Sequence, residues 1–136
     1  MSWFGLAMAP PSDTLFIPET QPIVYYDGGY YQPLIRAIYL YESGCNPYAV
    51  NTTENAHGGF QIRQNRLDHY NKLNGTNYVL TDCYDLELSK KIFLYFTTHD
   101  SSGREIKPKS WEQAAKNWNG SGPMTETYWE NVKNLI

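Results

Sequence analysis

Between Leu86 and Thr98 the sequence is so densely apolar that a helix there must be buried on most of its sides. The apolar residues of this segment are Leu86, Leu88, Ile92, Phe93, Leu94, Tyr95 and Phe96. No segment of the chain is long enough to span a membrane. A chain of 136 residues suffices for one domain, and this segment is expected to be its core helix.

Another helix is predicted to open near Pro33 and to close at Gly44. Proline suits a first helical turn, and glycine suits the position just past a helix end. The apolar stripe of this helix consists of Leu34, Ile35, Ala37, Ile38 and Tyr41. Residues 46–59 follow, and their content of Asn, Thr, Pro and Gly favours a loop or a short irregular hairpin.

Three more helices are predicted, over residues 60–72, 111–118 and 125–135. Ser110 is a suitable N-cap for the second of these, and Thr125 opens the third. The predicted fold class is therefore all-α, with a loop or short hairpin inserted after the first helix.

Residues 1–30 are predicted to form a Pro-rich arm that precedes a domain of residues 31–136. Prolines stand at positions 10, 11, 18 and 22, and Asp27-Gly28-Gly29 then breaks the chain. Two interpretations stay open, a poorly ordered tail and a docking segment for a partner. The first eleven residues have no positive charge and only a broken apolar stretch, so no secretory signal peptide is expected.

The charge balance argues against two classes of partner. With 11 Lys and Arg against 14 Asp and Glu, the net charge is -3, which gives no general attraction to nucleic acid or anionic lipid. The two cysteines, Cys45 and Cys83, are too few for a disulfide framework and lack the clustering of a zinc site. A single disulfide and two free thiols both stay possible, and no metal or cofactor is expected.

Glu42 is a charged residue at a position that is unfavourable for an anion in two respects. It continues the inward stripe of its helix, at positions three and four after Tyr39 and Ile38, and it stands in the last turn. There the helix dipole disfavours an anion by a few tenths to about 1 kcal/mol. Burial and the dipole both favour the protonated form, so the pKa should be raised, as a general acid at neutral pH requires. The alternative is an exposed glutamate near a frayed helix end.

Three short motifs follow one another in the sequence. They are Glu42-Ser43-Gly44-Cys45-Asn46-Pro47-Tyr48-Ala49-Val50, Gly58-Gly59-Phe60-Gln61-Ile62 and Trp118-Asn119-Gly120, with Tyr128 after the third. They resemble the motifs Glu-Ser-Gly-x-Asn-Pro, Gly-Leu-Met-Gln-Ile and Tyr-Asn-Ala-Gly of the lytic transglycosylase (SLT) family in the lysozyme-like superfamily. The resemblance covers about residues 31–136. Gly59 and Phe60 replace Leu and Met, and Trp118 replaces Tyr.

This resemblance implies a small α+β lysozyme-like fold and an enzyme that cuts the glycan strands of peptidoglycan. Glu42 would protonate the oxygen between N-acetylmuramic acid and N-acetylglucosamine and then act as a base on the sugar's own hydroxyl, leaving a 1,6-anhydro end. The implied substrate-binding residues are Ser43, Gly58, Gly59, Phe60, Gln61, Trp118, Asn119 and Tyr128. Ser43 could equally be a helix-end hydroxyl, and the glycines could simply make a turn.

Two alternatives remain. In a hydrolytic muramidase, Glu54 would assist water as a second carboxylate, although a solvated loop charge is the plainer interpretation of this residue. Asp68 and His57 are weaker candidates for the cleft. In the other alternative the chain is a weakly active wall-binding module of a phage tail or secretion machine. Without a signal peptide, delivery to the bacterial wall or periplasm would depend on a phage particle, a secretion apparatus or lysis.

Overall fold

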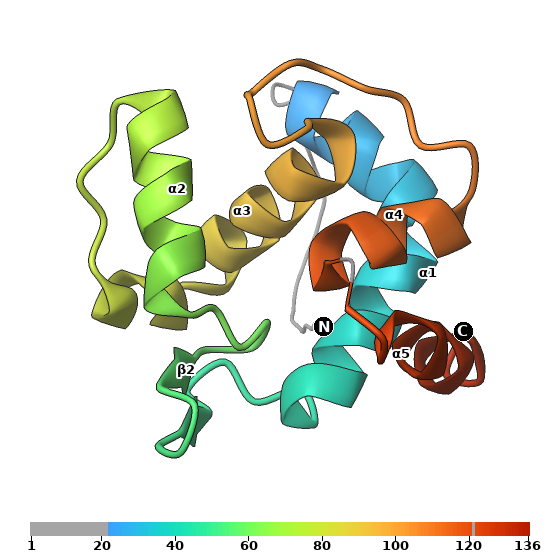
Figure 1. Ribbon diagram of the computed structural model, residues 1–136, viewed down its shortest axis with the longest axis horizontal. Helices are drawn as coiled ribbons and strands as arrows, with labels where there is room; N and C mark the ends of the chain where they lie inside the picture. The colour runs from blue at the N-terminus through green and yellow to red at the C-terminus, as the bar shows by residue number, and fades with distance from the viewer. Residues whose placement is uncertain (1–21, 121) are drawn as a thin grey trace, which may run out of the picture. The chain divides into compact units, whose positions relative to one another are not determined.

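The computed structural model describes residues 22–120 and 122–136, and most of the predicted Pro-rich arm lies outside this range. The chain divides into two units, Met1–Gln32 and Pro33–Ile136. The described residues form five α-helices, a 3-10 helix and a two-stranded sheet (Figure 1). The fold is thus mostly helical with a small β element. Within the described ranges no helix combines the length and the apolar character needed to cross a membrane.

Helix α1 (Pro22–Ser43) begins earlier than predicted. It continues through Asp27-Gly28-Gly29, where a break was expected, and Pro33 lies inside the helix rather than near its start. Glycine and proline cost a helix interior only about 1 and 3 kcal/mol, and such propensities are readily overridden by context. The predicted end is confirmed, since Gly44 adopts a left-handed φ of 66°.

The apolar stripe of α1 after Pro33 is largely confirmed. Leu34, Ile35, Ala37 and Ile38 are at most 2% exposed. Tyr41 does not belong to this buried stripe, because 41% of it is exposed.

A short antiparallel hairpin follows α1, which matches the second of the two forms predicted for residues 46–59. Strands β1 (Val50–Asn51) and β2 (Ala56–His57) pair Val50 with His57 and Asn51 with Ala56. The Asn51 side chain accepts a hydrogen bond from the backbone N–H of Glu54 at 3.1 Å. This contact fixes the turn between the strands.

Helix α2 (Gln64–Asn74) starts later than the predicted residue 60. Gln61 has a left-handed φ of 52°, and Ile62 pairs with His57 as an isolated β-bridge. Arg63 is extended, with φ -100° and ψ 163°. The residues before α2 therefore extend the hairpin, and α2 leads to a 3-10 helix η1 (Leu80–Tyr84) that was not predicted.

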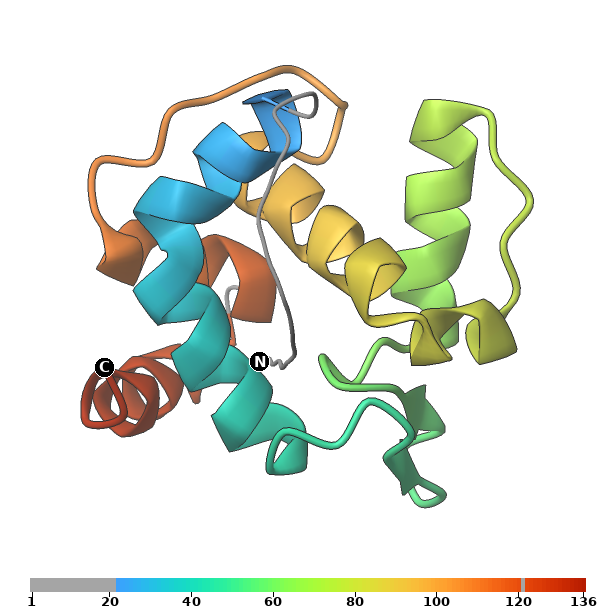
Figure 2. The same ribbon diagram turned by 180° about the vertical axis from the view of Figure 1, so that it is seen from behind.

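The last three helices agree closely with prediction. Helix α3 (Leu86–Thr98) has the predicted bounds, and α4 (Trp111–Asn119) and α5 (Thr125–Lys133) each differ only at their ends. Ser110 caps α4 as predicted, by accepting a hydrogen bond from the N–H of Gln113 at 3.1 Å. In both views α3 runs between α2 and α4 (Figures 1 and 2).

Helix α3 supplies the centre of the core of the second unit. Ile92 and Phe93 are fully buried and Phe96 is 6% exposed, whereas Leu86, Leu88, Leu94 and Tyr95 are only partly buried. The helix is thus buried along one broad face rather than on most of its sides. Phe60, Leu67, Trp118 and Val132 bring the loop before α2 and helices α2, α4 and α5 into the same core.

Both cysteines have free thiols. Cys45 is exposed and Cys83 is buried. Burial raises the pKa of the Cys83 thiol to about 12, so this thiol stays protonated and packs as a small apolar group.

Candidate active site

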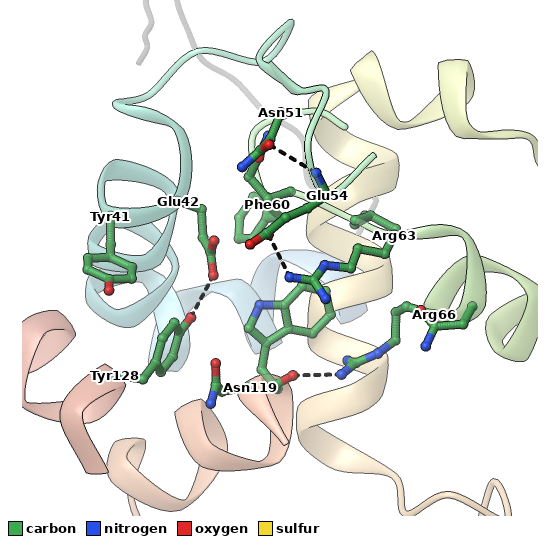
Figure 3. Close-up of a pocket in the computed structure, with 13 residues that line it drawn as sticks. Tyr41, Glu42, Asn51, Glu54, Phe60, Arg63, Arg66, Asn119 and Tyr128 are labelled. Atoms are coloured by element: carbon green, nitrogen blue, oxygen red, sulfur yellow. Dashed lines mark hydrogen bonds and ion pairs between the residues drawn. The ribbon is translucent and has the colours of Figure 1, made fainter. Parts of the chain in front are cut away.

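A cavity of about 520 Å³ lies within the second unit and draws its lining from all three motifs (Figure 3). Its lining residues are Tyr41, Glu42, Asn51, Glu54, Phe60, Gln61, Ile62, Arg63, Asn65, Arg66, Trp118, Asn119 and Tyr128. The structure therefore brings together seven residues proposed from the sequence, namely Glu42, Glu54, Phe60, Gln61, Trp118, Asn119 and Tyr128.

Glu42 lies at the C-terminal end of α1, and its carboxyl group is directed toward Tyr128 in the cavity (Figure 3). Burial raises its pKa from 4.5 to about 7, and the negative charge of Glu54 acts in the same direction. A hydrogen bond from Tyr128 and the positive charge of Arg63 lower it again. The direction agrees with the prediction, with desolvation as the main cause. A carboxyl group with this pKa both donates and accepts protons near neutral pH.

Tyr128, from α5, is the hydrogen-bond partner of Glu42. Its hydroxyl donates to Glu42 Oε2 at 3.1 Å, and its ring meets the edge of Tyr41 with centroids 5.3 Å apart. Burial and the nearby Glu42 carboxyl both raise the pKa of this tyrosine. Tyr128 therefore keeps its proton and serves Glu42 as a fixed donor.

Glu54 stands on the turn of the hairpin and lines the same cavity as Glu42. Its Oε1 accepts from Arg63 Nη2 at 2.5 Å, and the two side chains are 50% and 56% exposed, respectively. The residue is therefore neither a free loop charge nor an unpaired second carboxylate. It is a cavity-lining carboxylate with a cationic partner.

Phe60 and Gln61 of the second motif both line the cavity, and they make different contacts there. Phe60 is fully buried and stacks on Tyr39 with ring centroids 5.8 Å apart. The Gln61 side-chain amide donates to the carbonyl oxygen of Gly58 at 3.1 Å and to that of Ala49 at 3.4 Å. The side-chain amide of this implied substrate-binding residue thus holds the hairpin together.

Gly58 and Gly59 do not line the cavity. A Cβ atom on Gly58, whose φ is 85°, would collide with the carbonyl oxygen of Cys83. A Cβ atom on Gly59 would lie 2.5 Å from Cε1 of Tyr39. The two glycines therefore allow η1 and α1 of the protein itself to approach their backbone closely, rather than a ligand.

Ser43 also lies outside the cavity lining. Its hydroxyl donates to the carbonyl oxygen of Tyr39 at 3.0 Å and accepts from the N–H of Asn46 at 3.2 Å. These contacts end α1 and start the following loop, which is the helix-end role considered for this residue.

The third motif closes the cavity from α4. Trp118 is buried, and Arg66 lies over its ring with Cζ 4.5 Å from the centroid. Nη2 of Arg66 donates to the Trp118 carbonyl oxygen at 2.7 Å, which fixes the guanidinium beside the cavity. Asn119 is exposed and donates from Nδ2 to the Thr125 hydroxyl at 3.3 Å.

Arg63 and Arg66 are the main site residues that the sequence reasoning missed. For Arg63 one signal was available, because it directly follows Gln61-Ile62 of the second motif. The two weaker candidates do not line the cavity. Asp68 accepts from Gln64 at 2.8 Å, and His57 bridges Asn55 and Tyr84 at 2.8 and 2.9 Å.

Residues 22–120 and 122–136 contain no group of three or more His, Cys, Asp or Glu side chains placed to hold a metal ion. Comparisons of the chain with protein-family models, curated proteins and solved structures gave no match.

Proposed function

We propose that this protein is a lysozyme-like enzyme that cleaves the β-1,4 bond between N-acetylmuramic acid and N-acetylglucosamine in peptidoglycan, with Glu42 as its catalytic acid and base. One observation carries the proposal: the carboxyl group of the first motif has a pKa of about 7 inside a polar cavity that contains residues of all three motifs. The motif resemblance supplies the substrate class.

The chemistry requires a proton donor at the bridging oxygen, because this oxygen leaves poorly unless it is protonated as the bond breaks. Glu42 meets this need, since about half of its carboxyl groups are protonated near pH 7. Tyr128 donates to Oε2 and so holds the carboxyl group in one orientation. After donating its proton, Glu42 is the base that the second step needs.

We favour transglycosylation as the second step. In this route the C6 hydroxyl of the muramyl sugar attacks its own C1, and the hydroxyl proton passes to Glu42, which leaves a 1,6-anhydro end. Attack within one molecule gains a large effective concentration. The pairing of Glu54 with Arg63 supports this route, because it leaves Glu42 as the only cavity-lining carboxyl group without an ion-pair partner among the described residues.

A hydrolytic muramidase is the second candidate, and the position of Glu54 in the same cavity favours it. A second carboxylate could take a proton from water, which would then attack C1 and leave a reducing end. A weakly active wall-binding module stays a third proposal. In each case the target is the bacterial wall or periplasm, and delivery would come from a phage particle, a secretion apparatus or lysis.

The test is digestion of purified peptidoglycan by the wild type, by Glu42→Gln and by Glu105→Gln. Glu105 is an exposed glutamate outside the cavity and so serves as a matched control. Glu42→Gln should lose at least about 100-fold in rate, because an amide cannot donate and recover the proton, and Glu105→Gln should retain the wild-type rate. Mass spectra of the products distinguish the routes, since an anhydro end is lighter by one water than a reducing end. Near-normal cleavage by Glu42→Gln would refute the proposal.

A further inference from the structure

From the pairing of Glu54 with Arg63 at the cavity, we infer that Arg63 restrains Glu54 from acting as a second catalytic carboxylate and thereby directs the reaction toward the anhydro product. This inference rests on the proposed function and adds a residue that determines its outcome. Arg63 is a positioning residue in this account, because it acts through Glu54.

The backbone that carries Glu54 is held from two sides. Its N–H donates to Asn51 Oδ1 at 3.1 Å, inside the turn between the paired strands. After the turn, Asn55 Oδ1 contacts Nε2 of His57 at 2.8 Å, and Nδ1 of His57 contacts the Tyr84 hydroxyl at 2.9 Å. The hairpin is thus tied to η1, and the Glu54 side chain starts from a fixed position at the cavity.

Arg63 starts from an equally fixed position. It is the extended residue that precedes α2, and its carbonyl oxygen accepts from the N–H of Leu67 in the first turn. Among the described residues Glu54 is its one carboxylate partner, at 2.5 Å between Nη2 and Oε1. Figure 3 shows this contact within the group of residues that also contains Glu42. The ion pair therefore joins the hairpin to the start of α2 at the cavity.

The two members of the pair have opposite effects on Glu42. The negative charge of Glu54 raises its pKa and the positive charge of Arg63 lowers it, and both residues line the cavity that holds the Glu42 carboxyl group. An unpaired Glu54 would stabilise positive charge at C1 of the sugar and take a proton from water. Arg63 offsets the charge and occupies one of the two carboxylate oxygens.

The two outcomes differ in the nucleophile. In both, the bond from C1 to the leaving oxygen breaks, and this oxygen takes the proton of Glu42. In hydrolysis, water forms the new bond to C1 and its proton passes to Glu54, which gives a reducing end. In transglycosylation, the C6 oxygen forms the bond and its proton passes to Glu42, which consumes no water. Restraint of Glu54 makes the base that the first outcome needs less available.

The expected effect is moderate, because both side chains are about half exposed and such ion pairs are weak. A bound sugar displaces water and strengthens the pair, but a large effect is not required. Loss of Arg63 should therefore raise the ratio of reducing to anhydro ends by about two- to fivefold.

The test compares the product ratio for the wild type, Arg63→Gln, Glu54→Gln and the double variant on purified peptidoglycan. Arg63→Gln should raise the ratio, Glu54→Gln alone should not raise it, and the double variant should return to the wild-type ratio. Arg63→Lys, which keeps the charge, should stay near wild type. Arg104→Gln is the matched control, because Arg104 pairs with Asp100 at 3.2 Å outside the cavity.

An unchanged ratio in Arg63→Gln would overturn the inference while leaving glycan cleavage by Glu42 intact. A severe loss of rate in Glu54→Gln would also overturn it, because Glu54 would then already act as a catalytic residue in the wild type. Failure of the wild type to release any glycan ends would instead overturn the proposed function, and this inference with it.

Discussion

Replacement of Glu42 by Gln should stabilise the protein, and the gain should grow as the pH rises. Glutamine keeps an oxygen that can accept from Tyr128, but it has no charge to bury. The pKa of Glu42 rises from 4.5 to about 7 in the folded protein. Ionisation therefore opposes folding, and the stability that the protonated carboxyl contributes is complete below about pH 4.5 and is lost as the pH passes about 7. At about 1.4 kcal/mol for each pKa unit, the difference amounts to about 3 kcal/mol.

The measurement is urea unfolding of both proteins at about pH 4, pH 6 and pH 8, with Glu105→Gln as the control. The free energy of unfolding of Glu42→Gln relative to wild type should increase by about 3 kcal/mol between the lowest and the highest pH, which is on the order of 10 °C in Tm. The exposed Glu105→Gln substitution should change stability by less than about 0.5 kcal/mol. A difference for Glu42→Gln that stays constant or shrinks as the pH rises would refute the reasoning, because the carboxyl would then not be desolvated.

Two further predictions concern contacts of the site and its support. Tyr128→Phe removes a hydrogen bond that lowers the pKa of Glu42. The alkaline limb of the pH–rate profile of glycan cleavage should therefore move to higher pH. A limb that stays in place or moves to lower pH would contradict this prediction. Gly58→Ala should destabilise the protein by about 2 kcal/mol or more in urea unfolding, because its Cβ would meet the Cys83 carbonyl oxygen at a left-handed φ. Gly75→Ala is its matched control, because Gly75 has a φ of 66° and no atom lies within 4 Å of the added Cβ. This control should lower the free energy of unfolding by only about 1 kcal/mol. Equal losses of stability in the two variants would show that the Cys83 contact is unimportant.

The sequence predicted best what local signals determine. The bounds of α3 follow from a dense apolar run, and the start of α4 follows from the Ser110 cap. The inward position of Glu42 follows from helical periodicity, and its raised pKa follows from that position. These features depend on residues within a few positions of one another.

The errors fall where distant contacts decide the structure. Residues 60–63 were expected to be helical, but Ile62 pairs with His57 and Gln61 takes a left-handed conformation. Gly58 and Gly59 were assigned to a ligand, although η1 and α1 occupy the space beside them. Periodicity cannot reveal either contact, because each partner lies elsewhere in the chain.

The two arginines were missed for a related reason. In the sequence, Arg63 and Arg66 are ordinary polar residues at the start of a helix. Their roles come from Glu54 on the hairpin and from Trp118 on α4, which the fold places beside them. The cationic part of the cavity is therefore a product of tertiary structure.

The most direct test of Glu42 as the catalytic acid is the rate of glycan release from purified peptidoglycan between about pH 5 and about pH 9. The pKa of about 7 predicts that this rate falls above neutrality, by about tenfold for each further pH unit, as the carboxyl loses the proton that it must donate. Glu42→Gln should show no such limb, because its amide does not ionise in this range. The absence of glycan release at every pH, or a wild-type rate that stays constant across this range, would contradict the account.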